Sequence, residues 1–94
     1  MYRVEIHREA KKEIENLPAE TKEKVVELLI NLQTTPYPFR DYDLKKLKGL
    51  SNVFRIRLGN YRISYYIDDK EKLVIILEVK IRGGAYKVLK RRLP

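Results

Sequence analysis

The sequence predicts an α+β fold in which a small antiparallel β-sheet is covered on one face by an N-terminal helical hairpin. Apolar and polar residues alternate on both sides of Gly59-Asn60, which is typical of a tight β-hairpin. Two stretches before residue 34 place apolar residues at helical spacing, and residues 73–77 form an apolar run of strand length. The predicted order is therefore β-α-α-β-β-β with a short C-terminal helix, in one domain of residues 1–94.

The N-terminal part predicts one strand and two helices. Residues 2–6 alternate like a strand, and residues 8–17 have apolar side chains at helical spacing. Pro18 suits the first turn of a second helix, because the first N–H groups of a helix have no partner inside it. We expect this helix to end near Gln33. The apolar positions of the two helices are Ala10, Ile14 and Leu17 in the first, and Val25, Leu28, Leu29 and Leu32 in the second.

A loop is predicted over residues 34–43, where Pro36 and Pro38 prevent regular structure. We expect three aromatic residues to hold it against the core, namely Tyr37, Phe39 and Tyr42. Three lysines then lead into Gly49, and they are candidates for contacts with a phosphate backbone: Lys45, Lys46 and Lys48.

The last strand is predicted over residues 72–82, after an acidic turn at residues 68–71. It should run antiparallel to residues 61–67, and its apolar start indicates that helices cover it on at least one side. The opposite face of the sheet is expected to stay open at least in part. Gly83-Gly84 ends the strand, and residues 85–93 predict a short basic helix whose Lys87 is a further candidate for RNA binding.

The predicted hairpin divides its side chains between two faces. A type II′ turn at Gly59-Asn60 pairs Arg57 with Arg62 and Arg55 with Ser64. Like charges directly opposite each other destabilise a sheet mildly. Three arginines on one face therefore predict an anion site, because the planar guanidinium matches phosphate geometry. The other face can be buried, and it carries Phe54, Ile56, Leu58, Tyr61, Ile63 and Tyr65.

The last strand extends this site. Its C-terminal end should lie beside the start of the strand that carries Arg62. We therefore expect Arg57, Arg62 and Arg82 to converge at one end of the sheet, with Arg55 one step further along. Tyr86 should lie just past the Gly-Gly bend.

The charge is distributed unevenly along the chain. The formal net charge is +8, with −1 over residues 1–39 and +9 over residues 40–94. Such segregation predicts a polyanionic partner, either a nucleic acid or an acidic protein. The chain has no cysteine, which excludes disulfides and thiolate chemistry. No apolar run is long enough to cross a membrane and no secretory segment is visible at the N-terminus, so we expect a cytoplasmic protein.

Conventional catalytic groups are scarce. His7 is the only histidine and lies at the entry to the first helix, which excludes a ribonuclease with paired histidines. Asp68 and Asp69 are turn residues, so no metal site and no cofactor are predicted. The helical acids are expected on solvated faces, and they are Glu13, Glu20, Glu23 and Glu27. Polar tail residues could bind a nucleic acid or an acidic protein, or simply face solvent, and they are Lys87, Lys90, Arg91 and Arg92.

Two segments resemble a known family. Arg-Ile-Arg-Leu-Gly-Asn-Tyr-Arg-Ile-Ser-Tyr at residues 55–65 and Lys-Ile-Arg-Gly-Gly-Ala-Tyr at residues 80–86 are similar to the RelE branch of the RelE/ParE toxin superfamily. The opening Tyr-Arg-Val-Glu-Ile and the Leu17-Pro18 between the helices fit as well, so the resemblance covers nearly the whole chain. It implies the toxin of a toxin–antitoxin pair. RelE-type members cut messenger RNA in the ribosomal A site, whereas ParE-type members share the fold, poison DNA gyrase and do not cleave RNA.

The resemblance also implies roles for individual residues. Arg55 and Arg57 match basic residues around the scissile phosphate, Arg62 and Arg82 match two further family arginines, and Tyr86 matches a tyrosine beside the cut. Some relatives have lysine at the first two positions. The implied function is a ribosome-dependent, metal-independent endoribonuclease, with a RelB-like antitoxin, the ribosome and mRNA as partners. A ParE-like gyrase inhibitor and an inactive RNA-binding relative stay open as alternatives.

Overall fold

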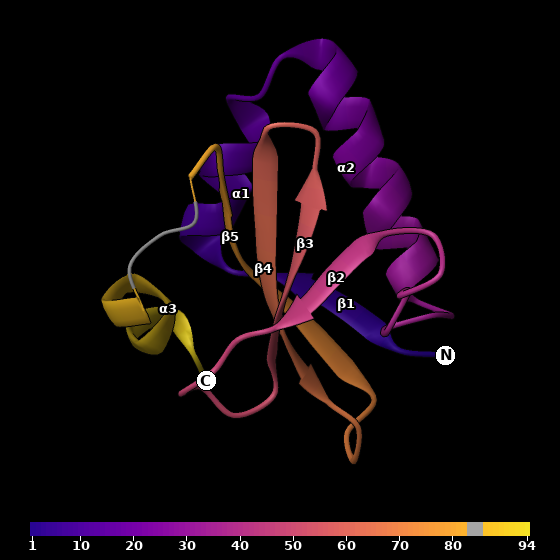
Figure 1. Cartoon of the computed structure of the whole chain (residues 1–94), viewed down its shortest axis with the longest axis vertical. Coiled ribbons are helices and arrows are strands. Elements are labelled where there is room, and N and C mark those ends of the chain that lie inside the picture. Colours follow the sequence, from indigo (N-terminus) through magenta and orange to yellow (C-terminus); the bar gives the residue numbers. More distant parts are fainter. Residues whose placement is uncertain (83–85) are drawn as a thin grey trace.

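The computed structural model describes residues 1–82 and 86–94. Two helices lie on one face of a five-stranded sheet, and a third helix lies beyond the other face (Figure 1). The strand order across the sheet is β1-β5-β4-β3-β2. In chain order the elements are β1 (Arg3–Ile6), α1 (Arg8–Glu15), α2 (Ala19–Leu32), β2 (Asp43–Lys46), β3 (Val53–Leu58), β4 (Tyr61–Asp68), β5 (Leu73–Lys80) and α3 (Tyr86–Arg92).

The α+β class is confirmed, but the sheet is mixed rather than antiparallel throughout. β1 pairs with β5 in parallel, with Arg3 opposite Leu73. The prediction missed this pairing because it joins opposite ends of the chain.

The strand β2 was also missed, because its sequence was read as a lysine-rich segment leading into Gly49. It lies at the edge of the sheet and pairs antiparallel with β3. Charged residues are common in edge strands, where they discourage pairing with other chains. Lysine content therefore does not argue against a strand at this place.

The central hairpin has the predicted register. Arg57 lies opposite Arg62, and Arg55 opposite Ser64. Gly59 has a φ of +62°, and among the described non-glycine residues only Asn52 and Lys72 have positive φ. A positive φ at the first loop residue alone is what a type II′ turn needs. The Gly-Asn pair therefore fixes which side chains share each face.

The main core lies between the sheet and the helical hairpin. The predicted helical stripes are confirmed, since Ala10, Ile14, Val25, Leu28 and Leu32 are buried there and Leu17 and Leu29 pack against them. In the loop between α2 and β2, Tyr37 and Tyr42 also contact this core, as predicted. Phe39 does not, because it is 68% exposed and its ring lies beside the Arg40 guanidinium.

A second, smaller core lies on the opposite face, under α3. It contains Leu47 and Leu50 from the β2–β3 connection, Val53 of β3, Leu77 of β5 and Leu89 of α3. This core covers one part of that face and leaves the part that carries the arginines accessible. Helix α3 thereby limits the site without covering it.

Arg92 fastens α3 to the rest of the molecule. Its guanidinium donates hydrogen bonds to the Leu77 carbonyl at 2.8 Å and to Glu13 at 3.2 Å, and an Nε–Oε2 distance of 3.4 Å joins it to Glu9. Glu13 also accepts a hydrogen bond from the Val79 amide. Burial lowers the pKa of Arg92, but the hydrogen bond to Glu13 and the charges of Glu13, Glu9 and Glu78 outweigh it, so the pKa is raised. The predictions of a solvated Glu13 and of a polar-surface or RNA-binding Arg92 were wrong, because helical spacing does not reveal an ion pair between residues 79 positions apart.

Asp69, in the β4–β5 turn, joins three segments. Its carboxylate accepts hydrogen bonds from the hydroxyls of Tyr2 at 2.6 Å and Tyr37 at 2.7 Å. These bonds lower the pKa of Asp69. The hydrogen bond to Asp69 raises the pKa of Tyr2, while burial and then this bond raise that of Tyr37. The turn, the first residues and the proline loop are thus held together.

We expect Arg92→Met to lower the free energy of unfolding by about 3 kcal/mol, because removing one partner of a buried ion pair leaves the other without its charge partner. Urea denaturation would measure this. Arg91→Met is the matched control, since Arg91 is exposed in the same helical turn and its loss should change stability little. Equal stability of the two variants would contradict the role of Arg92.

The Asp69 contacts predict a pH dependence. A carboxyl whose pKa is lowered by folding stabilises the native state above its unfolded pKa of about 3.9, and this contribution is lost as the pH falls through the folded value. Wild type should therefore be more stable than Asp69→Asn at pH 7, and the difference should disappear in acid. Urea titrations from pH 7 to pH 2 would test this, with Glu71→Gln as a control from the same turn. A difference that persists unchanged at pH 2 would show that the carboxylate charge is not involved.

Candidate functional site

The site is a face of the sheet on which side chains from four strands form two parallel rows. Residues that are register partners project from the same face of a sheet. The first row runs across β2, β3, β4 and β5 as Asp43, Arg57, Arg62 and Lys80. The second row runs beside it as Lys45, Arg55, Ser64 and Glu78. We call this surface the arginine face.

Two cavities lie on the arginine face. One, of about 220 Å³, is lined by Asp43, Lys45, Arg55, Arg57 and Arg62. The next, of about 240 Å³ and at the Gly59-Asn60 end of the hairpin, is lined by Arg57, Arg62 and Arg82 together with Ile81 and the turn itself. The predicted meeting of Arg57, Arg62 and Arg82 at one end of the sheet is therefore present in the structure, with Arg55 one row further along.

Arg55 lies deeper than its neighbours. Its Nε donates a hydrogen bond to the Ser64 hydroxyl at 3.2 Å, whereas its Nη2 is buried and has no hydrogen-bond partner among the described residues. A buried donor without a partner costs about 1–3 kcal/mol. An oxygen of a bound phosphate could accept from it, so this atom favours an anion in the cavity.

Tyr86 lies at the other end of these cavities from Arg82. With Lys45, Lys46, Leu47, Lys48 and Arg55 it lines a third cavity of about 280 Å³. Its ring lies over Gly49, where an added Cβ would be 3.6 Å from Cε2, and Gly49 itself has a φ of +83°. The sequence predicts Tyr86 just past the Gly83-Gly84 bend, and in the structure the cavity that Tyr86 lines also contains Arg55, not Arg62 or Arg82. The bend at Gly83-Gly84, on which that prediction rested, lies outside the described residues.

The three cavities share lining residues in succession. The first two share Arg57 and Arg62, and the first and third share Lys45 and Arg55. We call the three together the basic groove. It leads from Arg82 to Tyr86.

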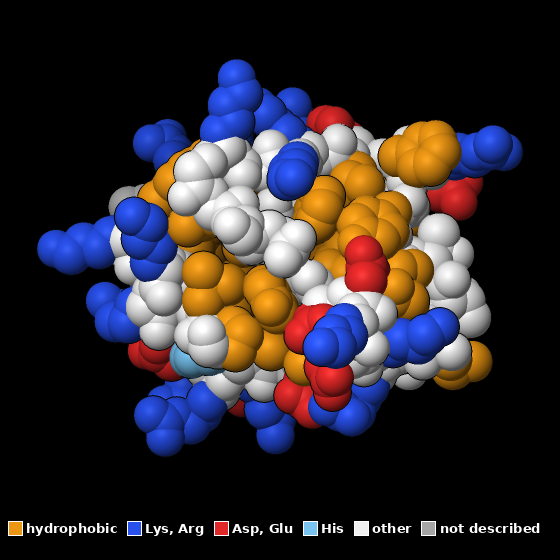
Figure 2. All heavy atoms as spheres, turned by 90° about the horizontal axis from the view of Figure 1, so that it is seen from below, with side chains coloured by type: hydrophobic (Ala, Val, Ile, Leu, Met, Phe, Trp, Pro, Cys, Tyr) orange, Lys and Arg blue, Asp and Glu red, His pale blue; other side chains and the backbone are white. Residues whose placement is uncertain are grey.

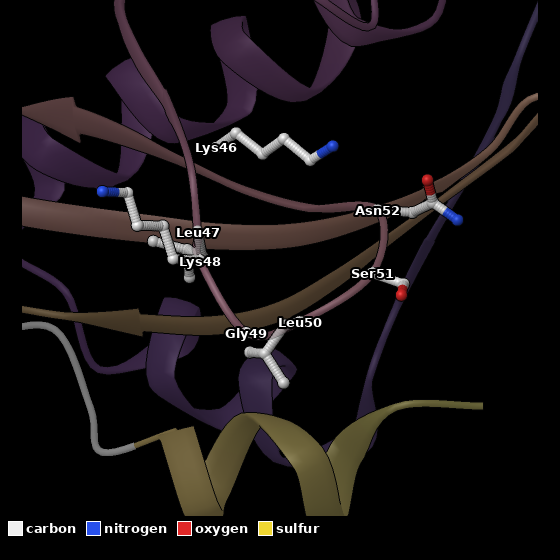
Figure 3. Close-up of a pocket in the computed structure, with 7 residues that line it drawn as sticks. All are labelled: Lys46, Leu47, Lys48, Gly49, Leu50, Ser51 and Asn52. Atoms are coloured by element: carbon white, nitrogen blue, oxygen red, sulfur yellow. The ribbon is translucent and has the colours of Figure 1, made fainter.

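The lysines before Gly49 lie at the Tyr86 end of the groove. The connection from β2 to β3 surrounds a further hollow of about 660 Å³ lined by residues 46–52. Figure 3 shows that Leu50 points toward α3, whereas Lys46 and Lys48 point away in different directions. Leucines thus fix the loop to the second core, and its lysines stay exposed. Lys87 is exposed on α3 and does not line the basic groove as defined.

Positive charge is not limited to the groove. Lys and Arg side chains project around the rim of the molecule when it is seen from the end that carries the β4–β5 turn, and hydrophobic side chains are exposed nearer the middle (Figure 2). A charged rim attracts a polyanion from a distance. The arginine face adds the close, directional contacts.

Three residues of the arginine face were missed by the sequence reasoning, namely Asp43 of β2 and Glu78 and Lys80 of β5. Lys80 lies opposite Arg62, and Glu78 lies opposite Ser64 with 1% of its surface exposed. A register irregularity between Ser64 and Tyr65 decides which residues of β5 reach this face. Alternation alone does not locate such an irregularity, although the antiparallel pairing of β4 and β5 did indicate that some residue of β5 had to lie beside Arg62.

The described residues contain no group of three or more His, Cys, Asp or Glu side chains placed to hold a metal ion. His7 caps α1, where its Nδ1 accepts a hydrogen bond from the Glu9 amide at 3.1 Å.

None of the helices in the described parts of the chain is both long and apolar enough to span a membrane. Apart from the carboxylate of Asp43, the charged groups that line the groove are guanidinium and ammonium groups.

Residues 4–86 match the family described as the ParE toxin of type II toxin-antitoxin system, parDE. A curated protein of Methanocaldococcus jannaschii, named provisionally as toxin RelE1, is 37% identical over 86 residues that cover 92% of this chain and 96% of that protein. A chain in the crystal structure of the archaeal RelE–RelB complex from Pyrococcus horikoshii OT3 superposes with a TM-score of 0.79 and 36% identity, over 89% of this chain and 98% of that one. A chain of the RelBE2 toxin–antitoxin complex from Mycobacterium tuberculosis superposes with a TM-score of 0.72 and 32% identity, over 86% of this chain and 98% of that one.

Proposed function

The chain belongs to the RelE/ParE family of toxins of type II toxin–antitoxin systems, on its RelE side, and from this premise we propose that it is a ribosome-dependent endoribonuclease that cleaves mRNA in the A site. The observation that carries the proposal is the cavity lined jointly by Arg57, Arg62 and Arg82. Three guanidinium groups around one small cavity suit a phosphate whose charge increases during a reaction.

The proposed reaction is attack of a 2′-hydroxyl on the adjacent phosphate. Its transition state is a phosphorane with additional negative charge, and preorganised cations that stabilise such charge are often the largest catalytic contribution. We assign this task to Arg57, Arg62 and Arg82, with Arg55 on a neighbouring phosphate. Tyr86 can stack on a base at the other end of the groove, a contact worth about 1–3 kcal/mol. Lys45, Lys46 and Lys48 lie where the RNA backbone would leave the groove.

The ribosome supplies what the isolated protein lacks. The groove is open and no histidine lies in it, so the site holds charge-stabilising groups without the usual proton carrier. Holding a nucleotide in line for attack is a proximity effect that can be as large as charge stabilisation. We therefore expect the toxin to cleave RNA efficiently only where the ribosome presents it.

The second partner is a RelB-like antitoxin. The structures from P. horikoshii and M. tuberculosis are toxin–antitoxin complexes. We propose that the antitoxin of this chain uses amphipathic segments to cover exposed apolar surface. It would also place acids near the arginine face or displace the basic helix α3.

Primer extension on a defined mRNA tests the proposal, with purified toxin and programmed ribosomes beside a reaction without ribosomes. Cuts at A-site codons that need ribosomes support it. An absence of cuts, in a protein that still arrests growth, would contradict it and favour the ParE-like alternative, which a gyrase supercoiling assay then tests. That alternative has its own support, because the matched family description is that of a ParE toxin.

We expect Arg62→Ala and Arg82→Ala each to slow cleavage by about 100-fold or more, since removing one donor that stabilises a transition-state charge has an effect of this size. Both variants should fold normally and lose toxicity, because Arg62 and Arg82 are exposed. The rate is measured by primer extension and the fold by urea denaturation. Arg40→Ala is the control, as an exposed arginine beside Phe39 and outside the groove. Undiminished toxicity of both groove variants would refute the assignment of the site.

A further inference from the structure

Ile81 is an exposed apolar residue at the end of the basic groove that holds Arg82. It directly follows β5, and 57% of its surface is exposed. It lines the cavity of about 240 Å³ together with Arg57, Arg62 and Arg82. Among the described residues around this cavity, Ile81 supplies the one apolar side chain. Such a side chain offers a phosphate no hydrogen bond, whereas the flat face of an RNA base suits it.

The place of Ile81 is more informative than its exposure, because single apolar residues are common on protein surfaces. Ile30 of α2, for example, is 59% exposed and lines none of the three cavities of the groove. A phosphate held by the three arginines brings the two nucleotides that it joins to the walls of the cavity. Ile81 is one of these walls.

Tyr86 is the counterpart of Ile81 at the other end of the groove. It is 40% exposed and lines a cavity with Arg55, whereas the neighbouring Leu47 is only 3% exposed. Among the described lining residues, apolar side chains that a substrate can reach therefore lie at both ends, with cations between them. Proteins that bind single strands combine cations along the backbone with side chains that pack against the faces of the bases.

The backbone beside Ile81 is held in the sheet. Lys80, the last residue of β5, is the register partner of Arg62 in β4. Isoleucine is branched at Cβ, which restricts the first torsion of its side chain. A contact surface that is ordered before binding loses little conformational entropy when the ligand arrives. Ile81 is therefore suited to hold a base in one position.

Resting on the nuclease function proposed above, we propose that Ile81 packs against the base on one side of the cut phosphate, while Tyr86 stacks on the base on the other side. The phosphate then lies between them, against the arginines. Ile81 contacts the face of the base and forms no hydrogen bond with its edge, so it accepts any base. Its contribution is to hold one of the two nucleotides in place for in-line attack.

The test combines variants of the protein with messages that lack a single base. Three messages share one sequence: the first is intact, and the other two are abasic at the nucleotide on one or the other side of the linkage that wild type cuts. Each is cleaved on programmed ribosomes by wild type, Ile81→Ser, Ile81→Leu and Ile30→Ser. Ile30 is the matched control, as an isoleucine of similar exposure outside the groove. Cleavage is followed over long times and at high toxin concentration, so that slow rates are measured too.

We expect Ile81→Ser to cut the intact message about 10-fold more slowly than wild type, since losing the burial of roughly half an isoleucine side chain has an effect of this size. On one of the two abasic messages the variant and wild type should cut at the same rate, because the contact is already absent there. On the other abasic message the 10-fold difference should persist. Ile81→Leu should stay close to wild type and Ile30→Ser should match it on every message, and urea denaturation checks that each variant is folded.

Three results overturn the inference. Wild-type rates of Ile81→Ser on the intact message exclude Ile81 from substrate binding. An equal loss on all three messages shows that the substitution disturbs the arginines and removes no contact with a base. Wild type that cuts both abasic messages as fast as the intact one shows that neither base is held. All three leave the nuclease function intact, whereas a wild type that does not cut even the intact message contradicts the proposed function and this inference together.

Discussion

The arrangement of the whole site depends on one constraint, the pairing of β3 with β4 through Gly59-Asn60. That register puts Arg57 directly opposite Arg62, a like-charge contact that costs stability in a sheet. The same register turns Ile56 and Ile63 into the main core on the other face. A slip of one residue would move every side chain to the opposite face. Burial of the apolar face therefore holds the arginines together against their repulsion.

One face of the sheet forms the main core, and the other carries the proposed anion site beside a smaller core. The helical hairpin buries one face almost entirely, whereas the small core under α3 covers only part of the other. Arg92 fastens α3 through Glu13 and the Leu77 carbonyl, so the position of Tyr86 at the start of that helix depends on contacts at its end. The groove is thus bounded on one side by the β3–β4 turn and on the other by a helix that is itself held by an ion pair.

Local patterns predicted the parts of the fold that depend on near neighbours. Alternation around the Gly-Asn pair gave the hairpin register, and helical spacing gave the buried stripes of α1 and α2. Contacts between distant residues were not predicted. Nothing in the sequence near Tyr2 indicates its bond to Asp69, and nothing near Glu13 indicates its bond to Val79. The parallel pairing of β1 with β5 is likewise invisible in the local sequence. Arg55, Arg57 and Arg62 were found because they share a hairpin, and Arg82 because the last strand was expected to run antiparallel to it. Glu78 and Lys80 were not, since the extra residue in β5 that directs them is a tertiary feature.

The central claim is that the Arg57–Arg62 pair costs stability and serves to bind an anion. Thermal and urea unfolding of wild type and of Arg62→Thr, each with and without a short single-stranded RNA, test this claim. Without RNA, Arg62→Thr should be more stable than wild type by about 0.2–1 kcal/mol, because the repulsion with Arg57 is removed. RNA should raise the melting temperature of wild type, since a ligand that binds only the folded state stabilises it, and should raise that of the variant much less. A variant that is less stable than wild type, or that responds equally to RNA, would contradict the account.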